Sequence, residues 1–444
     1  MTWILPIGSE LRFEGLEEPV TVVRGIGAGS QGQVFEAQLG GERLAIKWYF
    51  PACLKRDPQL RRRLEESIRR TAPSDSFLWP LALLRPTPAT ARLLRLAEPG
   101  FGLLMALRPE RYVGIHEHTG GHVSISLRTA LRAAFRLADA FHHLHLRGLC
   151  YKDISLGNLF LDPADGAILI CDNDNVDVDG RDPGSVLGTP GFMAPEVLLG
   201  RARPGTSSDL FSLAVLIFRL LTRHDPLLGQ MEREIRCLDE PARRRLYGED
   251  PVFIFDPTDE RNRPDPVEHL AALTLWPVYP LELRALFVQT FGGGLKEPTR
   301  RALTGQWKQA LAACLDRRVL CGACGQENFP APAQENVLCW GCGTPLAQGM
   351  ELRLAHGRMA AAAENELHLH HFDARQEPDI ERPLARVVAH STDPRLLGLE
   401  NLSCQTWTAQ LRDGRRLEIP PGQRCNLAAT AGLHTEAGPI QVAR

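Results

Sequence analysis

The sequence predicts an α+β fold in which a large domain with a strand-rich part and a helical part is followed by two smaller modules, one built around four cysteines and one rich in β-strands. Four observations support this prediction. Short β-branched runs around a glycine-rich segment near the N-terminus indicate a strand-rich lobe, and an amphipathic pattern over 125–147 indicates a helical one. Two C-x-x-C pairs follow, and short apolar runs between turn residues fill 350–444.

Length and composition limit the expected number of domains, the kinds of partner and the location of the protein. A chain of 444 residues is too long for one ordinary core, so two or three domains are expected. The net charge of −2 means that the protein as a whole has no excess of positive charge to attract a nucleic acid or an anionic membrane surface. The N-terminal residues lack a basic signal-peptide region, and no run reaches the length of a membrane span. A cytoplasmic location is therefore expected, with free thiols and a metal site among the 11 cysteines.

The glycine-rich segment 25–32 joins two predicted strands, and the turn at Gly40 leads into a third strand that carries Lys47. A dinucleotide-binding loop would open a helix, whereas residues 34–39 favour a second strand. Glycines let such a hairpin lie close over nucleotide phosphates, and Lys47 can reach them as a point charge. A flexible turn is the alternative for the glycines alone.

Residues 151–174 arrange two acids and an amide around two short predicted strands, 159–161 and 168–170. Asn158 and Asp172 offer hard oxygen ligands for a divalent cation, and Asp153 offers a carboxylate that can accept a hydroxyl proton. Phosphoryl transfer with magnesium needs these parts, because its catalysis is mostly positioning and charge neutralisation. A hairpin with solvated turn acids is the alternative for this stretch alone.

The order of these motifs resembles that of protein kinases. Residues 44–47 are similar to V-A-I-K, 151–158 to H-R-D-x-x-x-x-N, and 172–174 to D-F-G. Residues 188–196, GTPGFMAPE, closely resemble the end of the activation segment of serine/threonine kinases. Asp209 lies in a segment resembling D-x-[WF]-S-L-G, and Arg301 closes one resembling D-P-x-x-R, whose arginine pairs with the glutamate matching Glu196.

The resemblance covers residues 20 to about 317 and implies a bilobal kinase domain over 1–317, divided near residue 107 into an N-lobe and a C-lobe. It implies ATP and Mg²⁺ as cofactors and serine or threonine in proteins as the substrate, with the chain itself among the candidates. Asp153 would take the hydroxyl proton, and Asn158 and Asp172 would hold magnesium. The other implied nucleotide-binding positions are Gly27, Gly29, Gly32, Val34, Ala45, Lys47, Met105 and Leu107.

A helix over 59–70 should carry the glutamate that pairs with Lys47. Glu65 and Glu66 both qualify by their distance along the chain. Glu65 is favoured because it precedes Ile68 by three residues, on the apolar side of the helix.

Four departures from the kinase pattern stand out: Tyr151 for histidine, Lys152 for arginine, Ser155 for lysine, and Asn173-Asp174 for Phe-Gly. Lysine cannot make the bidentate phosphate contact of arginine. Ser185 is the only hydroxyl between Asp172 and Thr189, so control by phosphorylation of this segment is not expected to dominate. An active but atypical kinase is predicted, and a pseudokinase scaffold that binds nucleotide and recruits partners through its tail is the alternative.

The tail begins with Cys321 and Cys324, followed after residues 325–338 by Cys339 and Cys342. Two such pairs on tight knuckles present four thiolates to one tetrahedral ion, which predicts a structural zinc ribbon over 318–349. Nucleic-acid binding through the ribbon is disfavoured, because residues 319–350 hold no Lys or Arg.

Residues 350–444 predict a small β-sandwich-like domain that faintly resembles a forkhead-associated domain, although the residues that read phosphothreonine cannot be placed. A strand over 367–371 would set His368, His370 and His371 along a surface rather than around a metal. The layout of kinase, ribbon and β-domain resembles that of bacterial kinases associated with tellurite-resistance gene clusters. That resemblance implies partnership with a von Willebrand A-type protein and a metal-dependent protein phosphatase.

Overall fold

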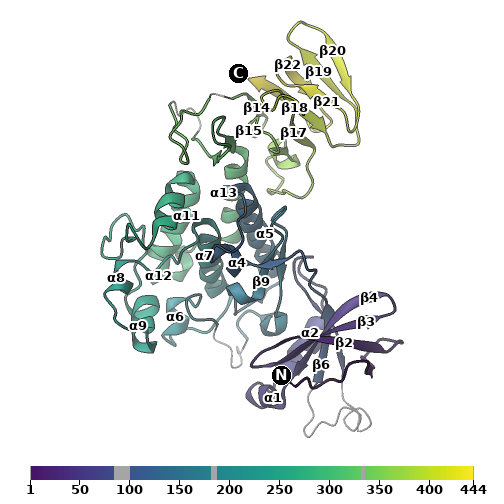
Figure 1. The fold of residues 1–444 in the computed structure, drawn as a ribbon, viewed down its shortest axis with the longest axis vertical. Helices are drawn as coiled ribbons and strands as arrows, with labels where there is room; N and C mark the ends of the chain where they lie inside the picture. The colour runs from purple at the N-terminus through teal and green to yellow at the C-terminus, as the bar shows by residue number, and fades with distance from the viewer. Residues whose placement is uncertain (1, 85–100, 182–187, 332–335, 348, 444) are drawn as a thin grey trace.

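The computed structural model describes residues 2–84, 101–181, 188–331, 336–347 and 349–443. A strand-rich N-terminal lobe, a helical lobe and a strand-rich C-terminal domain follow one another along the long axis of the molecule (Figure 1). The N-terminal lobe and the C-terminal domain therefore lie at opposite ends, with the helical lobe between them. No helix within the described ranges is long and apolar enough to cross a membrane.

The N-terminal lobe is built on an antiparallel sheet with the strand order β1-β2-β3-β4-β6-β5. Its strands are β1 (Glu10–Leu11), β2 (Val20–Ala28), β3 (Gly32–Leu39), β4 (Glu42–Tyr49), β5 (Pro80–Leu84) and β6 (Phe101–Ala106). Phe35, Ile46 and Trp48 belong to the core on one face, and Leu64 joins Tyr49 in a smaller core beneath the two helices. These are α1 (Pro51–Arg56) and α2 (Leu60–Arg69).

The helical lobe is centred on α5 (Leu127–Leu146), which packs against α7 (Thr206–Thr222) and α13 (Thr304–Asp316). The predicted helix over 125–147 begins two residues late, because the Ser126 side chain accepts a hydrogen bond from the Thr129 N–H and caps the first turn. The remaining helices are α4 (Ile115–Thr119), α6 (Pro195–Leu198), α8 (Gln230–Arg233), α9 (Glu240–Arg244), α10 (Leu270–Leu275), α11 (Leu281–Phe291) and α12 (Gly293–Lys296).

Short strands line the helical lobe where it faces the N-terminal lobe. β9 (Leu159–Leu161) and β10 (Ile168–Ile170) form the predicted hairpin, with β7 (Val113–Gly114) beside β9. β8 (Leu149–Cys150) pairs with β11 (Asp177–Val178). Asp153 and Asn158 lie just before this hairpin, and Asp172 lies just after it.

Two sheets form the C-terminal domain and share one apolar core, which includes Leu352, Val387, Leu399 and Trp407. The first has the order β15-β14-β23-β22-β19-β20, with strands β14 (Glu351–Leu354), β15 (Gly357–Ala360), β19 (Trp407–Leu411), β20 (Arg416–Ile419), β22 (Thr430–His434) and β23 (Pro439–Ala443). The second has the order β16-β17-β18-β21, with strands β16 (Glu366–Leu367), β17 (Ala385–Ala389), β18 (Leu397–Asn401) and β21 (Arg424–Asn426).

One predicted strand of this domain is wrong. The strand expected over 367–371 ends at Leu367, and Leu369–His371 form a 3₁₀ turn, η6. The turn ends the alternation, so the three histidines do not line an exposed surface: His368 and His371 are 4% and 2% exposed.

The C-terminal domain is docked on α5 and α13 by ion pairs. Arg132 of α5 contacts Glu366 at 2.7 Å, and Arg136 contacts Glu381 at 2.6 Å. Arg318, just after α13, is 3% exposed. It bonds Glu327 at 2.6 Å and the Asn365 side chain at 3.0 Å, which joins the cysteine-bearing segment to the C-terminal domain.

Candidate active site

The backbone around Asp153 is held from below by Asp209 of α7. Its two carboxylate oxygens accept the N–H groups of Tyr151 at 2.7 Å and Lys152 at 2.9 Å. Asp209 is 2% exposed, so these are charge-assisted bonds in a region of low dielectric. Lys152 has a positive φ of 72°, a costly conformation that the two bonds help to maintain.

Tyr151 stands where the kinase pattern has a histidine. It joins the loop around Asp153 to residues 171–174, which are called the metal loop below. Its hydroxyl donates to the carbonyl of Cys171, and its ring packs edge-on against Phe141 of α5. Asp172 follows at a positive φ of 56°. A bulky aromatic hydrogen-bond donor thus connects the two loops where the motif has an imidazole.

Asp153 faces the cleft beside a hydroxyl. Its Oδ1 accepts a hydrogen bond from the Thr189 hydroxyl at 2.7 Å, and the Asn158 side-chain amide donates to its backbone carbonyl at 3.0 Å. Burial raises the pKa of Asp153, assisted by the charge of Asp172, although the Thr189 bond opposes the shift. The carboxylate is therefore oriented to accept from a hydroxyl, and its affinity for a proton is above that of a solvated aspartate.

Lys47 reaches across the cleft from β4 to the metal loop. Its Nζ is ion-paired with Asp172 and Asp174 and also donates to the Gln31 side chain at 3.0 Å. Burial alone would lower the pKa of Lys47, but the charges of Asp174 and Asp172 outweigh it and raise that pKa. The lysine is therefore held as a cation between the lobes.

The described partners of Lys47 include two acids other than Glu65, and the predicted pair between Lys47 and Glu65 stays a prediction. Within the described contacts, Glu65 forms an ion pair with Arg61 at 3.3 Å, while the lysine bonds Asp172 and Asp174. The reason is the acid at the third position of the metal loop: Asp174 is 3% exposed and is buried beside Lys47. Asp174 stands out in the sequence as a departure from glycine, but its pairing with the lysine was not predicted.

Asn173, at the second position of the metal loop, anchors that loop to the N-terminal lobe. Its side-chain amide donates to the carbonyl of Leu78 at 2.8 Å and to that of Ile170 at 3.2 Å. The phenylalanine of the family pattern holds this position by apolar packing, whereas Asn173 uses directed hydrogen bonds. This fixes the turn that presents Asp172 and Asp174.

The glycines of the β2–β3 hairpin have different environments. A Cβ at Gly32 would lie 1.9 Å from the carbonyl oxygen of Trp48, so only glycine fits there. The Cβ positions of Gly27 and Gly29 face open space. Gly32 is therefore required for the close approach of β3 to β4, while Gly27 and Gly29 leave room above Lys47.

The positions expected around an adenine lie on adjacent strands. Val34 pairs with Lys47 across β3 and β4, and Ala45 pairs with Met105 across β4 and β6. Ala45 is buried, whereas Val34, Met105 and the following Leu107 are half-buried. These residues therefore form a continuous strip on the N-terminal side of the cleft.

The activation segment is tied down by carboxylates of this chain. Lys152 Nζ is 3.6 Å from Asp177, and both side chains are buried. Arg181 contacts Glu66 of α2 at 2.6 Å, which links the segment to the N-terminal lobe. Ser185 and the rest of 182–187 lie outside the described residues. Lys152 thus already has an acidic neighbour where the family arginine would meet a phosphate.

The end of the activation segment is fixed by a buried ion pair. Arg301 is 1% exposed and contacts both carboxylate oxygens of Glu196, at 2.8 and 2.7 Å. Ser212 of α7 donates to the carbonyl of Phe192 at 2.6 Å. These bonds hold Thr189 in place beside Asp153.

A second candidate site is formed by the four paired cysteines. The Sγ atoms of Cys321 and Cys342 are 3.7 Å apart, and those of Cys324 and Cys339 are 3.6 Å apart. All four lie within 4.8 Å of one another. Burial opposes ionisation of Cys339, but the N–H groups of Cys342 and Gly341 outweigh it and lower its pKa to about 6. This set could hold a metal ion that prefers thiolates.

Comparison with known proteins finds similarity to protein kinases over part of the chain. The family model described as "Protein kinase domain" matches residues 103–260. The chain is 31% identical over 245 residues to CBL-interacting protein kinase 4 of Oryza sativa subsp. japonica, which covers 49% of this chain and 52% of that protein. It is 27% identical over 256 residues to ribosomal protein S6 kinase alpha-4 of Mus musculus, covering 54% and 31%. With protein kinase C delta type of Mus musculus it shares 28% identity over 222 residues, covering 49% and 31%.

The matched residues and the names of these relatives, all of them kinases, agree with the kinase resemblance predicted from the motifs. The chain spans about half of the length of the first of these relatives and about a third of the other two. The matched portion contains Asp153, Asn158 and Asp172.

Proposed function

We propose that this protein transfers the γ-phosphoryl group of ATP, with Mg²⁺, to serine or threonine in proteins. One observation carries the proposal: Lys47 from one lobe is ion-paired with Asp172 from the other, in the same cleft where Asp153 accepts a hydroxyl. Transfer of a phosphoryl group requires a cation for the phosphates, a metal ligand and a proton acceptor in one place.

The residues present suit magnesium and ATP. Asn158 and Asp172 offer amide and carboxylate oxygens, the hard donors that Mg²⁺ prefers, and would hold the ion. When bound, the ion would neutralise charge on the phosphates. Lys47 would bind phosphate oxygens, and Asp174 would keep the lysine in position, a role first assigned to Glu65. Asp153 would orient the acceptor hydroxyl and take its proton.

The alternative function is that of a pseudokinase scaffold, and one observation supports it. Lys47 is already engaged by Asp172, Asp174 and Gln31, so nucleotide phosphates must displace the lysine from at least one of them. In such a scaffold the cleft would bind ATP without transferring a phosphoryl group, and nucleotide binding would serve regulation alone.

Transfer from γ-labelled ATP to a generic protein substrate separates the two functions when nucleotide binding is measured in parallel. An active kinase transfers label with Mg²⁺ and loses transfer, but not folding, in Asp153→Asn. A scaffold binds the nucleotide in both proteins and transfers label in neither.

We further propose that residues 318–349 form a structural zinc ribbon and that the tail is a docking or regulatory region. Four thiolates around one zinc ion are about 3.8 Å apart, close to the separations of the two sulfur pairs described above. A cytoplasmic location follows from a thiolate site and free cysteines, which persist in a reducing compartment. An X-ray absorption spectrum of fresh protein that shows no sulfur-bound zinc would contradict the ribbon.

The tail's expected partners, a von Willebrand A-type protein and a metal-dependent phosphatase, are part of this proposal. They are inferred from domain layout alone, so co-purification with the full chain but not with a folded chain truncated after residue 318 is the relevant test.

A further inference from the structure

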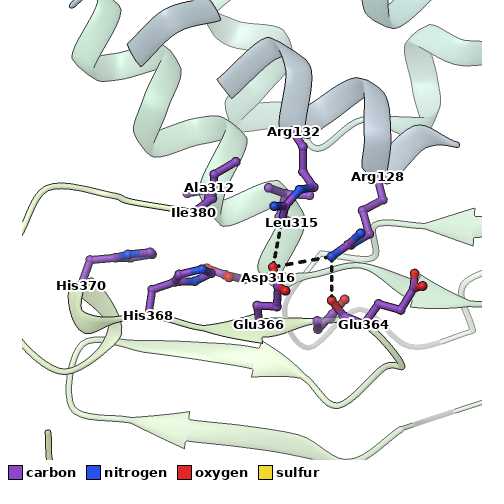
Figure 2. A pocket seen from close by; sticks show the side chains of 11 residues that line it. Arg128, Arg132, Ala312, Leu315, Asp316, Glu364, Glu366, His368, His370 and Ile380 are labelled. Atoms are coloured by element: carbon purple, nitrogen blue, oxygen red, sulfur yellow. Dashed lines mark hydrogen bonds and ion pairs between the residues drawn. The ribbon is translucent and has the colours of Figure 1, made fainter. Parts of the chain in front are cut away.

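Three histidines gather where the C-terminal domain meets the helical lobe. His368, His370 and His371 lie in and just before the η6 turn, and the turn packs against the end of α13. Figure 2 shows the His368 and His370 rings side by side below the helices, with Asp316 of α13 beside them. The arrangement joins two parts of the chain that are about 50 residues apart in sequence.

The geometry is that of a loosely assembled metal-ligand set. One ligand atom from each histidine lies within 4.8 Å of the others. The ring centroid of His368 is 5.6 Å from that of His370 and 5.9 Å from that of His371. Two imidazoles on one tetrahedral zinc have centroids about 5 Å apart and nitrogens about 3.3 Å apart. The rings are therefore nearly at the required spacing, and the nitrogens need to close by about 1 Å or more.

Two of the imidazole nitrogens are buried and unsatisfied. Nε2 of His368 and Nε2 of His370 have no hydrogen-bond partner among the described residues. A buried polar atom without a partner is costly, so such atoms usually mark a site for a bound species.

His371 completes the set together with Asp316. Its Nε2 is 3.1 Å from Asp316 Oδ1, and its Nδ1 is 3.2 Å from the carbonyl of His368. Nδ1 also accepts the N–H of His368 at 2.9 Å, so metal binding through Nε2 requires the proton to move to Nδ1, where the His368 carbonyl would accept it. Asp316 is then available as a carboxylate ligand or as a partner of the metal-bound histidines.

The surroundings accept a cation. The cavity lined by His368, His370 and Asp316 has a volume of about 20 Å³, room for one ion or one water molecule. Arg128 and Arg132 also face it, but Glu366 lies 3.5 Å from the first and 2.7 Å from the second.

We propose that His368, His370, His371 and Asp316 bind one zinc ion, or a similar borderline divalent metal, at this junction. Imidazole nitrogen with one carboxylate is a donor set that suits zinc and not magnesium. Three ligands come from the C-terminal domain and the fourth from α13. The ion would therefore fasten that domain to the helical lobe, independently of the four cysteines.

X-ray absorption at the zinc edge, combined with metal quantification on the full chain, tests this site. The two sites differ in bond length: thiolate sulfur lies at about 2.3 Å from zinc and imidazole nitrogen at about 2.0 Å. The full chain is expected to bind two zinc ions, one with sulfur ligands and one with nitrogen and oxygen only. The combined variant His368→Ala, His370→Ala should lose the second ion and keep the first. His390→Ala, at an exposed histidine of the same domain, should lose neither.

A titration of metal-free full chain with Co²⁺ gives a second measurement that needs no variant. Cobalt on thiolates gives intense charge-transfer bands, and cobalt on nitrogen and oxygen gives none. The proposal predicts one equivalent of each kind. It is overturned if only sulfur-bound metal is found, or if the nitrogen-bound metal persists in the histidine variant. Nitrogen-bound zinc without sulfur-bound zinc would end the ribbon proposal and leave this one standing.

Discussion

The cleft between the lobes and the junction between the helical lobe and the C-terminal domain both contain acidic and basic side chains, but in different proportions. In the junction each basic residue meets an acid across the interface, as Arg132 meets Glu366 and Arg136 meets Glu381. In the cleft a single lysine faces the two acids Asp172 and Asp174, with Asp153 nearby. Balanced charge fastens two surfaces together, whereas an excess of carboxylate leaves capacity for a divalent cation.

The largest expected effect is on the junction. Arg318→Met should weaken docking of the C-terminal domain by about 3–5 kcal/mol, because it removes the bonds to Ala363 and Asn365 of that domain and leaves the buried acid Glu327 without its cation. Hydrogen exchange of the amides in the C-terminal sheets measures the loss. The neighbouring Arg317→Met removes a pair with Glu282, whose side chain is 61% exposed, and should cost less than about 1 kcal/mol. Equal effects from the two variants would show that the junction does not depend on buried pairing.

The next effect is on the cleft. Lys47→Met or Asp172→Asn should lower phosphoryl transfer by on the order of 10² or more in a folded protein, because each removes preorganised charge from the site. Lys296→Met, at an exposed lysine of α12, is the control and should transfer at the parental rate. Parental rates in both cleft variants would mean that the site is assigned wrongly.

Within the cleft, the next prediction compares two acids, Asp174 and Glu65, as partners of Lys47. Asp174→Asn should reduce transfer on the order of tenfold, about 1.4 kcal/mol in activation free energy, because the lysine loses its buried carboxylate. Glu65→Gln should have a smaller effect, because Glu65 is paired with Arg61 in the structure. Steady-state kinetics with varied ATP decides between them, and the reverse order would restore Glu65 as the positioning acid.

The smallest effect is expected at the activation segment. Ser185→Ala should change transfer little, since Lys152 already has Asp177 as its neighbour. Truncation after residue 318 should change activity or partner binding clearly, because it uncovers the basic residues of α5 that the C-terminal domain now covers. A large loss from Ser185→Ala alongside a folded, unchanged truncation would reverse this assignment of control.

The sequence predicted the parts of the fold that depend on local pattern. The hairpin strands 159–161 and 168–170 appear as predicted, because β-branched and apolar runs were separated by a strong turn. The short helices of 229–280 were not predicted, since α8, α9 and α10 have too few residues for an apolar period.

Site residues that belong to sequence motifs were predicted, whereas contacts between residues far apart in the sequence were missed. Asp174 bonds Lys47 because β4 and the metal loop meet across the lobes, and no spacing along the chain encodes that meeting. The histidine cluster was missed because η6 ends the expected alternation and turns His368 into the junction. A run of three histidines within four residues was the only available signal.

The central claim is that the cleft transfers phosphate, and its most direct test is a time course of label from γ-labelled ATP, with and without Mg²⁺. Full-length protein should label itself or a generic protein substrate on serine or threonine, only with the metal. Asp153→Asn should bind nucleotide and transfer at least about 10²-fold more slowly. Equal label in both proteins, or none in the parent despite bound ATP and Mg²⁺, would contradict the account.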